Sequence, residues 1–217
     1  KGDGLDTAQG KELMERTFKQ LDNGLPARDM ELAEDEVDLF RHLTLLTGKP
    51  QLLVCNVSEG DAGTGNAHTE AVRDFVKARK SSDEVLVVCC TLEEEVSQMS
   101  EDEDAKAEML QAYGLQQTGL ARIIAESNKM LQLQTFYTVG PQEARAWSFP
   151  AGMRAPQCAG IIHSDFERGF IRANTIAYND FITCNGEAGA KDAGKMRLEG
   201  KEYECADGDV FHFLHKT

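Results

Sequence analysis

The spacing of apolar residues predicts two helices in the first 50 residues. Between Lys11 and Asn23 apolar side chains recur every three or four positions, the period of one helical face. The same period predicts a second helix from Glu34 to Thr47, which Gly48 and Pro50 would end. The apolar positions are Met14, Phe18 and Leu21 in the first helix, and Val37, Phe40, Leu43 and Leu46 in the second.

Two short, continuously apolar runs then predict buried strands at Leu52–Cys55 and Val85–Cys90, with a helix at His68–Lys80 between them. Strand, helix and strand in this order favour a parallel βαβ unit. The glycine-rich stretch Gly60–Asn66 does not have the Gly-x-x-x-x-Gly-Lys-[Ser/Thr] pattern of a phosphate-binding loop. We therefore expect a flexible surface loop there.

Two more helices follow before the pattern changes. A capping box at Ser100–Glu103 predicts a helix that runs to Tyr113, and Thr118 can cap a further helix with its apolar residues facing inward. Those residues are Leu120, Ile123, Ile124 and Leu131. From about Leu133, short alternating runs predict a small α+β domain, for which we expect a β-grasp fold.

The predicted elements of that domain are the strands Thr135–Val139, Ala144–Ser148 and Phe170–Tyr178, the helices Ala155–Phe166 and Glu187–Met196, and a hairpin of Lys201–Cys205 with Val210–Leu214. Asp207-Gly208 is the hairpin's turn signal. The chain as a whole is thus predicted to be α/β, with a helical arm in residues 1–48, a parallel-sheet part in residues 49–131 and an α+β domain in residues 132–217.

Composition narrows the function classes. The chain has 217 residues and a formal net charge of −14, which disfavours nonspecific binding to nucleic acid or anionic lipid. No apolar run is long enough to span a membrane, so no membrane partner is expected. The abrupt, polar start at Lys1 suggests a piece of something longer. We expect a reducing, cytoplasmic location and no metal site, since the six cysteines form no C-x-x-C pair: Cys55, Cys89, Cys90, Cys158, Cys184 and Cys205.

Polar residues follow both predicted parallel strands. Asn56-Val57-Ser58-Glu59 comes directly after the first strand, and Cys89-Cys90-Thr91 lies at the end of the second. In open α/β sheets, ligands bind beyond the carboxyl ends of the strands. The two segments therefore predict a ligand-facing edge, with an ordinary solvated turn as the alternative reading.

The tetrad resembles the Asn-x-x-Glu variant of the GTPase base-recognition motif found in the YchF/Obg-like ATPase family. The C-terminal part, residues 131–214, is similar to the TGS domain that closes these proteins. The matching segments are Phe136–Pro141, Glu143–Trp147, Ala155–Gly160, Ile162–Ala173 and Asp207–Val210. The resemblance extends upstream, where the helices before Pro50 resemble the second arm of the family's coiled-coil insertion and residues 51–131 resemble the second half of its nucleotide-binding domain.

This resemblance implies the C-terminal portion of a P-loop protein that binds and hydrolyses ATP, or also GTP, with Mg²⁺ and associates with ribosomes. No residue here matches the Walker A lysine or the Mg²⁺-binding hydroxyl. We therefore expect no catalytic residue in this chain, no nucleotide bound to it alone and no hydrolysis by it alone. The alternative is a non-enzymatic TGS module that binds RNA, the ribosome or a protein.

The resemblance also implies roles for the seven candidate residues. Asn56 would donate to the base N7, Val57 would pack on the base and offer its backbone amide, and Ser58 completes the tetrad. Glu59 would not pair with adenine as Asp does with guanine, because adenine N1 carries a lone pair instead of a hydrogen. Backbone groups of Cys89, Cys90 and Thr91 would meet the base from the second loop. For the alternative function, basic residues gather towards the C-terminus: Arg145, Arg154, Arg168, Arg172, Lys191, Lys195, Arg197 and Lys201. Trp147 is expected to be a buried anchor.

Overall fold

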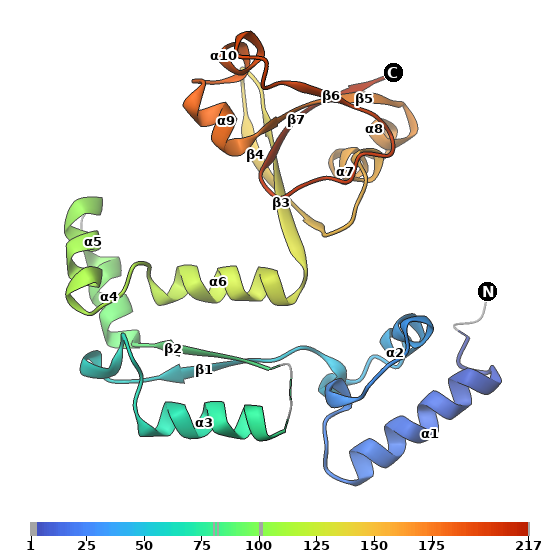
Figure 1. Cartoon of the computed structure of the whole chain (residues 1–217), viewed down its shortest axis with the longest axis vertical. Helices are drawn as coiled ribbons and strands as arrows, with labels where there is room; N and C mark the ends of the chain where they lie inside the picture. Colours follow the sequence, from blue (N-terminus) through green and yellow to red (C-terminus); the bar gives the residue numbers. More distant parts are fainter. Residues whose placement is uncertain (1–3, 80, 82, 100–101, 217) are drawn as a thin grey trace. The chain divides into compact units, whose positions relative to one another are not determined.

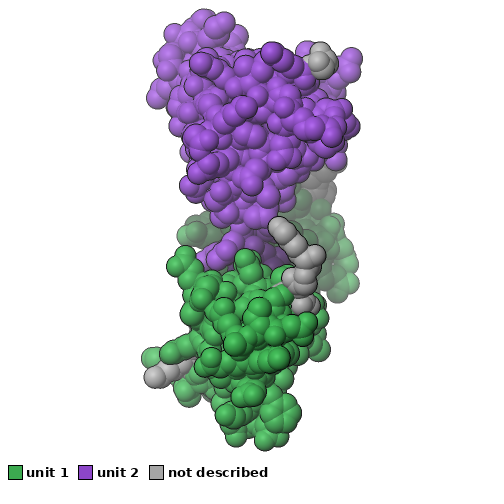
Figure 2. Space-filling view, turned by 90° about the vertical axis from the view of Figure 1, so that its right-hand side faces the viewer, with its two compact units in different colours: residues 1–127 green, residues 128–217 purple. Residues whose placement is uncertain are grey.

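The computed structural model describes residues 4–79, 81, 83–99 and 102–216, and the chain forms two compact units. Unit 1 comprises residues 1–127 and unit 2 residues 128–217, and Figure 2 colours them separately. Each unit is described by itself below. Within the described residues, no helix is long and apolar enough to cross a membrane.

Unit 1 begins with α1 (Ala8–Asp22), which Thr7 caps by accepting a hydrogen bond from the Gly10 amide. A 3-10 turn follows at Ala27–Asp29. The second predicted helix is shorter than expected, because a 3-10 turn at Glu34–Glu36 leads into α2 (Val37–His42) and a separate turn covers Leu46–Gly48.

The expected helix from Glu34 to Thr47 is therefore wrong in its second half. Thr44 takes a φ of +49°, a conformation that β-branched residues seldom adopt and that a helix cannot contain. The apolar spacing continues across this break, which is why periodicity alone did not find it. Leu46, placed on the helical face by the spacing, is exposed.

The apolar stripe of α1 lies on its open side. Leu13 is fully buried, whereas Met14, Leu21 and especially Phe18, at 69% exposure, face outward. This leaves an apolar helical face without cover from the described part of the chain.

The parallel βαβ prediction is confirmed for the two strands of unit 1. β1 (Leu52–Asn56) pairs in parallel with β2 (Glu84–Val88), and α3 (Ala67–Ala78) connects them. Figure 1 shows α3 and α6 (Gly119–Met130) on opposite sides of this pair. β2 is buried over its last three residues, whereas every residue of β1 is half-buried or exposed.

The predicted second strand ends two residues early. Cys89 directly precedes a helix that the apolar pattern did not reveal, α4 (Cys90–Gln98), and α5 (Glu103–Ala112) follows. Asp102 caps α5 through the Ala105 amide; the predicted capping residue Ser100 lies outside the described residues, as does Lys80 at the predicted end of α3.

α6 has the predicted cap, since Thr118 Oγ1 accepts a hydrogen bond from the Ala121 amide. Its expected inward face is wrong, because Leu120, Ile124 and Leu131 are more than half exposed. The core of this part lies instead between α4, α5 and the residues before α3, and it contains Ala62, Cys89, Leu92, Val96 and Leu110.

The glycine-rich stretch lies largely at the surface, as expected, but it makes specific contacts. Ala62 is buried, and a side chain at Gly63 would collide with the Tyr113 carbonyl oxygen. Asn66 caps α3 by accepting hydrogen bonds from the His68 and Thr69 amides. The stretch therefore joins β1 to α3 through defined contacts.

Unit 2 is built on a five-stranded mixed sheet with the order β4-β3-β7-β5-β6. Antiparallel pairs join β3 to β4, β5 to β7 and β5 to β6, while β3 and β7 run parallel. The strands are β3 (Leu133–Val139), β4 (Ala144–Pro150), β5 (Phe170–Ala177), β6 (Arg197–Glu199) and β7 (Asp209–His215). The helices are α7 (Ala155–Ile162), α8 (Ser164–Arg168), α9 (Tyr178–Thr183) and α10 (Glu187–Asp192).

The predicted C-terminal hairpin is wrong. Lys201–Cys205 contains no strand, and β7 lies between β3 and β5. Asp207-Gly208 does make a turn, but this turn holds β3, since Thr135 N–H donates to Asp207 Oδ1 (2.7 Å) and Gly208 N–H donates to the Thr135 carbonyl (2.8 Å). A turn signal does not reveal which strand the following residues pair with.

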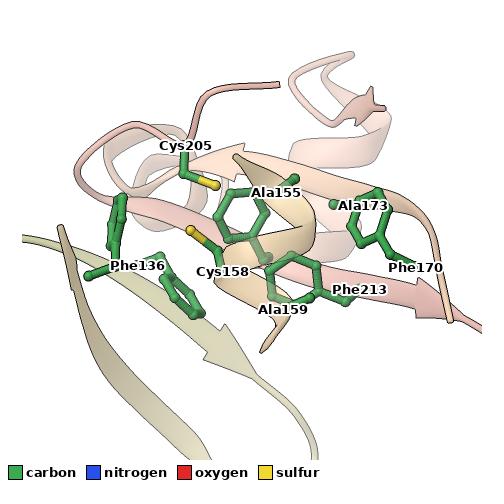
Figure 3. Packing of buried hydrophobic residues seen from close by; sticks show 10 residues of the cluster. Phe136, Ala155, Cys158, Ala159, Phe170, Ala173, Cys205 and Phe213 are labelled. Atoms are coloured by element: carbon green, nitrogen blue, oxygen red, sulfur yellow. The ribbon is translucent and has the colours of Figure 1, made fainter. Parts of the chain in front are cut away.

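The core of unit 2 lies between one face of the sheet and α7, as Figure 3 shows. Phe136 is its centre, with ring contacts to Trp147, Phe149, Phe211 and Phe213. The predicted helix Ala155–Phe166 is divided in two at His163, whose extended backbone ends α7 and whose Nδ1 accepts from the Asp165 amide to begin α8.

Candidate functional site

The two predicted ligand-facing segments meet at one edge of the parallel pair. Asn56, the last residue of β1, lies beside Val88, the last residue of β2. Asn56 Oδ1 accepts a hydrogen bond of 3.1 Å from the Cys90 backbone N–H at the start of α4. This contact fixes the Asn56 side chain and ties the two segments together.

The other candidate residues differ in how available they are. The Val57 amide donates to the Val88 carbonyl (2.9 Å), so it is already used, which contradicts the part of its expected role that required a free amide. Cys89 is buried, whereas Cys90 and Thr91 are exposed in the first turn of α4. Within the described residues, Asn56 Nδ2 and the Glu59 carboxylate have no hydrogen-bond partner.

Ser58 belongs to a small network that the sequence reading missed. Asp61 Oδ2 accepts hydrogen bonds from Ser58 Oγ (2.9 Å) and Asn66 Nδ2 (3.0 Å). Both hydrogen bonds lower the pKa of the Asp61 carboxyl, and the bond from Asn66 has the larger effect. The Ser58 hydroxyl therefore holds the loop after β1 in shape, and the Asn66 cap before α3 was the signal that could have found this network.

Glu93 supports the same edge from α4. Its carboxylate accepts hydrogen bonds from the amides of Gly119 (Oε1) and Leu120 (Oε2), the first two residues of α6. A carboxylate at a helix N-terminus stabilises the otherwise unpaired amides and the positive end of the helix dipole. Glu93 thereby connects α6 to the helix that begins at Cys90, a role that no local sequence pattern marked.

A second polar cluster lies at the amino end of β2. Arg28 Nε contacts Asp83 Oδ1 at 2.7 Å, and both side chains are largely buried. Beside this pair, burial raises the pKa of Asp29, but hydrogen bonds from Arg79 and Ser81 outweigh it and hold that pKa below its usual value. These pairs link the 3-10 turn after α1 to the parallel strands.

The pocket near α1 does not include the residues of the Asn56 edge. An open pocket of about 680 Å³ lies among Leu21, Arg28, Lys49 and Arg79. Among the described residues, no three His, Cys, Asp or Glu side chains gather closely enough to hold a metal ion. The residues at the Asn56 edge offer an amide donor, Asn56 Nδ2, and a carboxylate, Glu59.

Trp147, the single tryptophan, lies in unit 2 and is half-buried. Its ring lies between Phe136 (6.3 Å between centroids) and the Arg145 guanidinium (4.1 Å), and its Nε1–H donates to Thr138 Oγ1. Through these contacts and its hydrogen bond to Thr138, Trp147 links β4 to β3, and its ring is half-buried and not the buried anchor that we expected.

Comparison with solved structures finds proteins that share the fold of this chain. One solved structure, "Structure of the Schizosaccharomyces pombe YchF GTPase", superposes with a TM-score of 0.81 at 27% identity over 98% of this chain and 58% of that one. A "GTP binding protein from Pyrococcus horikoshii OT3" shares the fold, with a TM-score of 0.55 at 15% identity over 95% of this chain and 57% of that one. The chain therefore has the α/β fold, with a mixed sheet, of a YchF-type GTPase structure.

Sequence comparison is more specific. The family YchF-GTPase_C, described as "Protein of unknown function (DUF933)", matches residues 133–216. "Ribosome-binding ATPase YchF" of Bacillus subtilis (strain 168) is 46% identical over 204 residues, which are 93% of this chain and 55% of that protein. The Escherichia coli O157:H7 protein of the same name is 43% identical over 214 residues, 99% of this chain and 58% of that protein.

The chain belongs to the YchF family, as its sequence resemblance indicated. It spans a little over half the length of these curated relatives.

Proposed function

We propose that this chain supplies the base-recognition part of a YchF-type protein that binds and hydrolyses ATP, or also GTP, and works on ribosomes. The observation that carries the proposal is the hydrogen bond from Cys90 N–H to Asn56 Oδ1. It fixes the amide of Asn56 at the carboxyl end of two parallel strands, where α/β proteins bind their ligands. The relatives are named as ribosome-binding ATPases, and a cytoplasmic location is part of the proposal.

The residues fit a purine better than they fit phosphates. With Oδ1 of Asn56 engaged, its Nδ2 remains free to donate to a ring nitrogen such as N7. The Glu59 carboxylate also has no hydrogen-bond partner within the described residues. Because adenine N1 carries a lone pair, it would repel this carboxylate. We therefore expect the Glu59 carboxylate to lie away from adenine N1. Val57 would contribute only its side chain, because its amide is already used.

Phosphate binding and hydrolysis belong, in this proposal, to the part of the relatives that this chain does not match. Phosphoryl transfer depends on positioning the phosphates, Mg²⁺ and a water molecule. Mg²⁺ would be bound by that other part and by the nucleotide. The present residues would orient the base and, through Glu93 and α6, hold the edge of the site in place.

The test uses the chain and a chimera. The chimera joins the unmatched part of the Bacillus subtilis relative to this chain, and both proteins are titrated with ATP and GTP plus Mg²⁺ in a calorimeter. We expect no measurable binding by the chain alone and clear ATP binding by the chimera. Asn56→Ala should weaken chimera binding about tenfold, the value of one or two hydrogen bonds, whereas the exposed control Asn179→Ala should not.

Glu59→Asp in the chimera should raise GTP binding relative to ATP binding. Nucleotide binding by the chain alone would contradict the proposed division of roles. A chimera that binds ATP equally well with Asn56→Ala would show that the base is recognised elsewhere.

Unit 2 favours a second candidate function, that of a TGS-type module contacting the ribosome. Its mixed sheet, with the adjacent parallel strands β3 and β7 and with α7 across one face, supports the proposal that unit 2 is a β-grasp domain of the TGS type. Unit 2 has ten Lys and Arg against eleven Asp and Glu, a net charge of −1, while unit 1 has 13 against 26 and a net charge of −13. Unit 2 therefore repels the phosphates of RNA far less strongly than unit 1 does.

Ribosome co-sedimentation across a salt series tests this second function. If unit 2 contacts RNA phosphates, binding should fall steeply with salt, and Arg172→Ala should reduce the slope. A salt-independent interaction would instead indicate a ribosomal protein as the partner.

A further inference from the structure

Two buried thiols face each other inside unit 2, away from the Asn56 edge. Cys158 on α7 is fully buried, and Cys205, in the segment before β7, is 3% exposed. Figure 3 shows their sulfur atoms pointing toward one another within the core cluster. Both are free thiols in this structure, and the proposed functions use neither.

The backbone holds the two cysteines together. Cys205 N–H donates to the Met153 carbonyl and Ala155 N–H donates to the Tyr203 carbonyl, both at 2.9 Å. These bonds surround a β-bridge between residues 154 and 204, which fixes the segment before β7 against the start of α7. Cys158 lies one helical turn beyond that bridge. The thiols therefore meet because two chain segments are paired, and not only because of their side-chain rotamers.

The closed structure protects both sulfurs. A hydrogen bond with Cys158, together with burial, raises the pKa of the Cys205 thiol far above its ordinary value. A protonated, buried thiol reacts slowly, since the thiolate is the nucleophile. Reaction therefore requires the segment before β7 to move away from α7 and expose Cys205.

We propose that Cys158 and Cys205 are a disulfide-forming pair, which a hydroperoxide oxidises when the segment before β7 opens. In the first step the Cys205 sulfur takes an oxygen atom from hydrogen peroxide, which gives a sulfenic acid and one water. In the second step the Cys158 sulfur attacks that sulfur, the S–S bond forms, and the hydroxyl leaves with the Cys158 proton as a second water. The two thiols lose two electrons, and the peroxide is reduced.

The disulfide would join α7 to the segment before β7 and close a long loop that contains β5 and β6. Closing a long loop restricts the unfolded chain and stabilises the folded one. Oxidation should therefore make unit 2 more resistant to unfolding, and it would prevent the opening through which it formed.

The test treats the whole chain with hydrogen peroxide in a urea concentration just below its unfolding transition. Peptide mapping without reductant should find the Cys158 and Cys205 peptides joined, and the intact mass should fall by two hydrogens. After removal of urea, the thermal unfolding midpoint reported by Trp147 fluorescence should rise by about 15–30 °C, the shift expected when a disulfide closes a loop of this length in a unit of this size. Reduction with dithiothreitol should reverse the shift.

Cys184→Ser is the matched control, since Cys184 is a half-buried thiol of the same unit. It should form the same disulfide with the same shift, whereas Cys205→Ala should show neither. The proposal is overturned if peroxide oxidises the exposed Cys90 while Cys158 and Cys205 stay reduced, or if the joined peptides involve Cys184. Both outcomes are read on the unaltered chain, so they do not depend on how well a variant folds.

Discussion

Phe136→Ala is the most informative test of how unit 2 is held together. Phe136 is fully buried, and the centroids of four aromatic rings lie between 5.6 and 6.3 Å from its own. Removing a buried phenyl ring costs the transfer free energy of the ring and leaves a cavity, together about 3–5 kcal/mol. For a unit of this size the guanidinium chloride midpoint should fall by about 1 M, taking a slope of about 3 kcal/mol per M.

The single tryptophan makes the assay specific. Trp147 is in unit 2 and stacks on Phe136, so its fluorescence reports the unfolding of unit 2, while circular dichroism reports the helices of both units. Phe136→Ala should shift the fluorescence transition and leave the unit 1 part of the dichroism transition in place. Phe18→Ala, at 69% exposure in α1, should leave the fluorescence transition unchanged. If Phe136→Ala lowers the free energy of unfolding measured by fluorescence by less than about 1 kcal/mol, the assignment of this core is refuted.

Three further predictions use the same two signals. Asp83→Asn should destabilise unit 1 by about 3 kcal/mol in dichroism, because it leaves the Arg28 guanidinium largely buried without its counter-charge; an unchanged midpoint would mean that the pair is solvated in solution. Burial and the hydrogen bond to Asp209 raise the pKa of Tyr203 to about 12, above the ordinary 10.0, so the stability it contributes is complete below pH 10 and is lost as the pH rises toward 12. Tyr203→Phe should remove this alkaline loss from the fluorescence-detected stability, and an identical pH profile would contradict the assignment. Glu93→Gln should lower unit 1 stability by about 1 kcal/mol, since a neutral amide supports the α6 amides less well, and should speed hydrogen exchange at the start of α6.

Parts of the fold could be predicted because local chemistry decides them. The β1–β2 pair followed from two apolar runs, and the cap of α6 followed from Thr118. The edge formed by Asn56 and Cys90 followed from a general rule about where parallel strands end, although the roles of its residues remain predictions.

The predictions that were wrong concern elements whose structure depends on contacts between residues far apart in the sequence. The central place of β7 depends on two hydrogen bonds between Thr135 and the Asp207-Gly208 turn, one donated by Thr135 and one accepted by it. Nothing near residue 207 in the sequence indicates that Thr135 is the partner. The exposed face of α6 was predicted to lie in the core because it is apolar. An apolar stripe in the sequence does not indicate which element, if any, packs against it. The positive φ of Thr44 is equally invisible to periodicity.

The uneven charge of the chain bears on how the two proposed functions fit together. Unit 1 holds nearly all of the net negative charge, and the Asn56 edge belongs to it. An acidic surface repels both RNA and the phosphates of a nucleotide. The proposed base recognition at this edge therefore needs cationic groups or Mg²⁺ from the part of the relatives that the chain does not match. Unit 2, at a net charge of −1, meets no such barrier. Under the two proposed functions, unit 2 would contact the ribosome and unit 1 would contact the base of the nucleotide. Adding the unmatched part should raise nucleotide affinity without changing the salt dependence of ribosome binding.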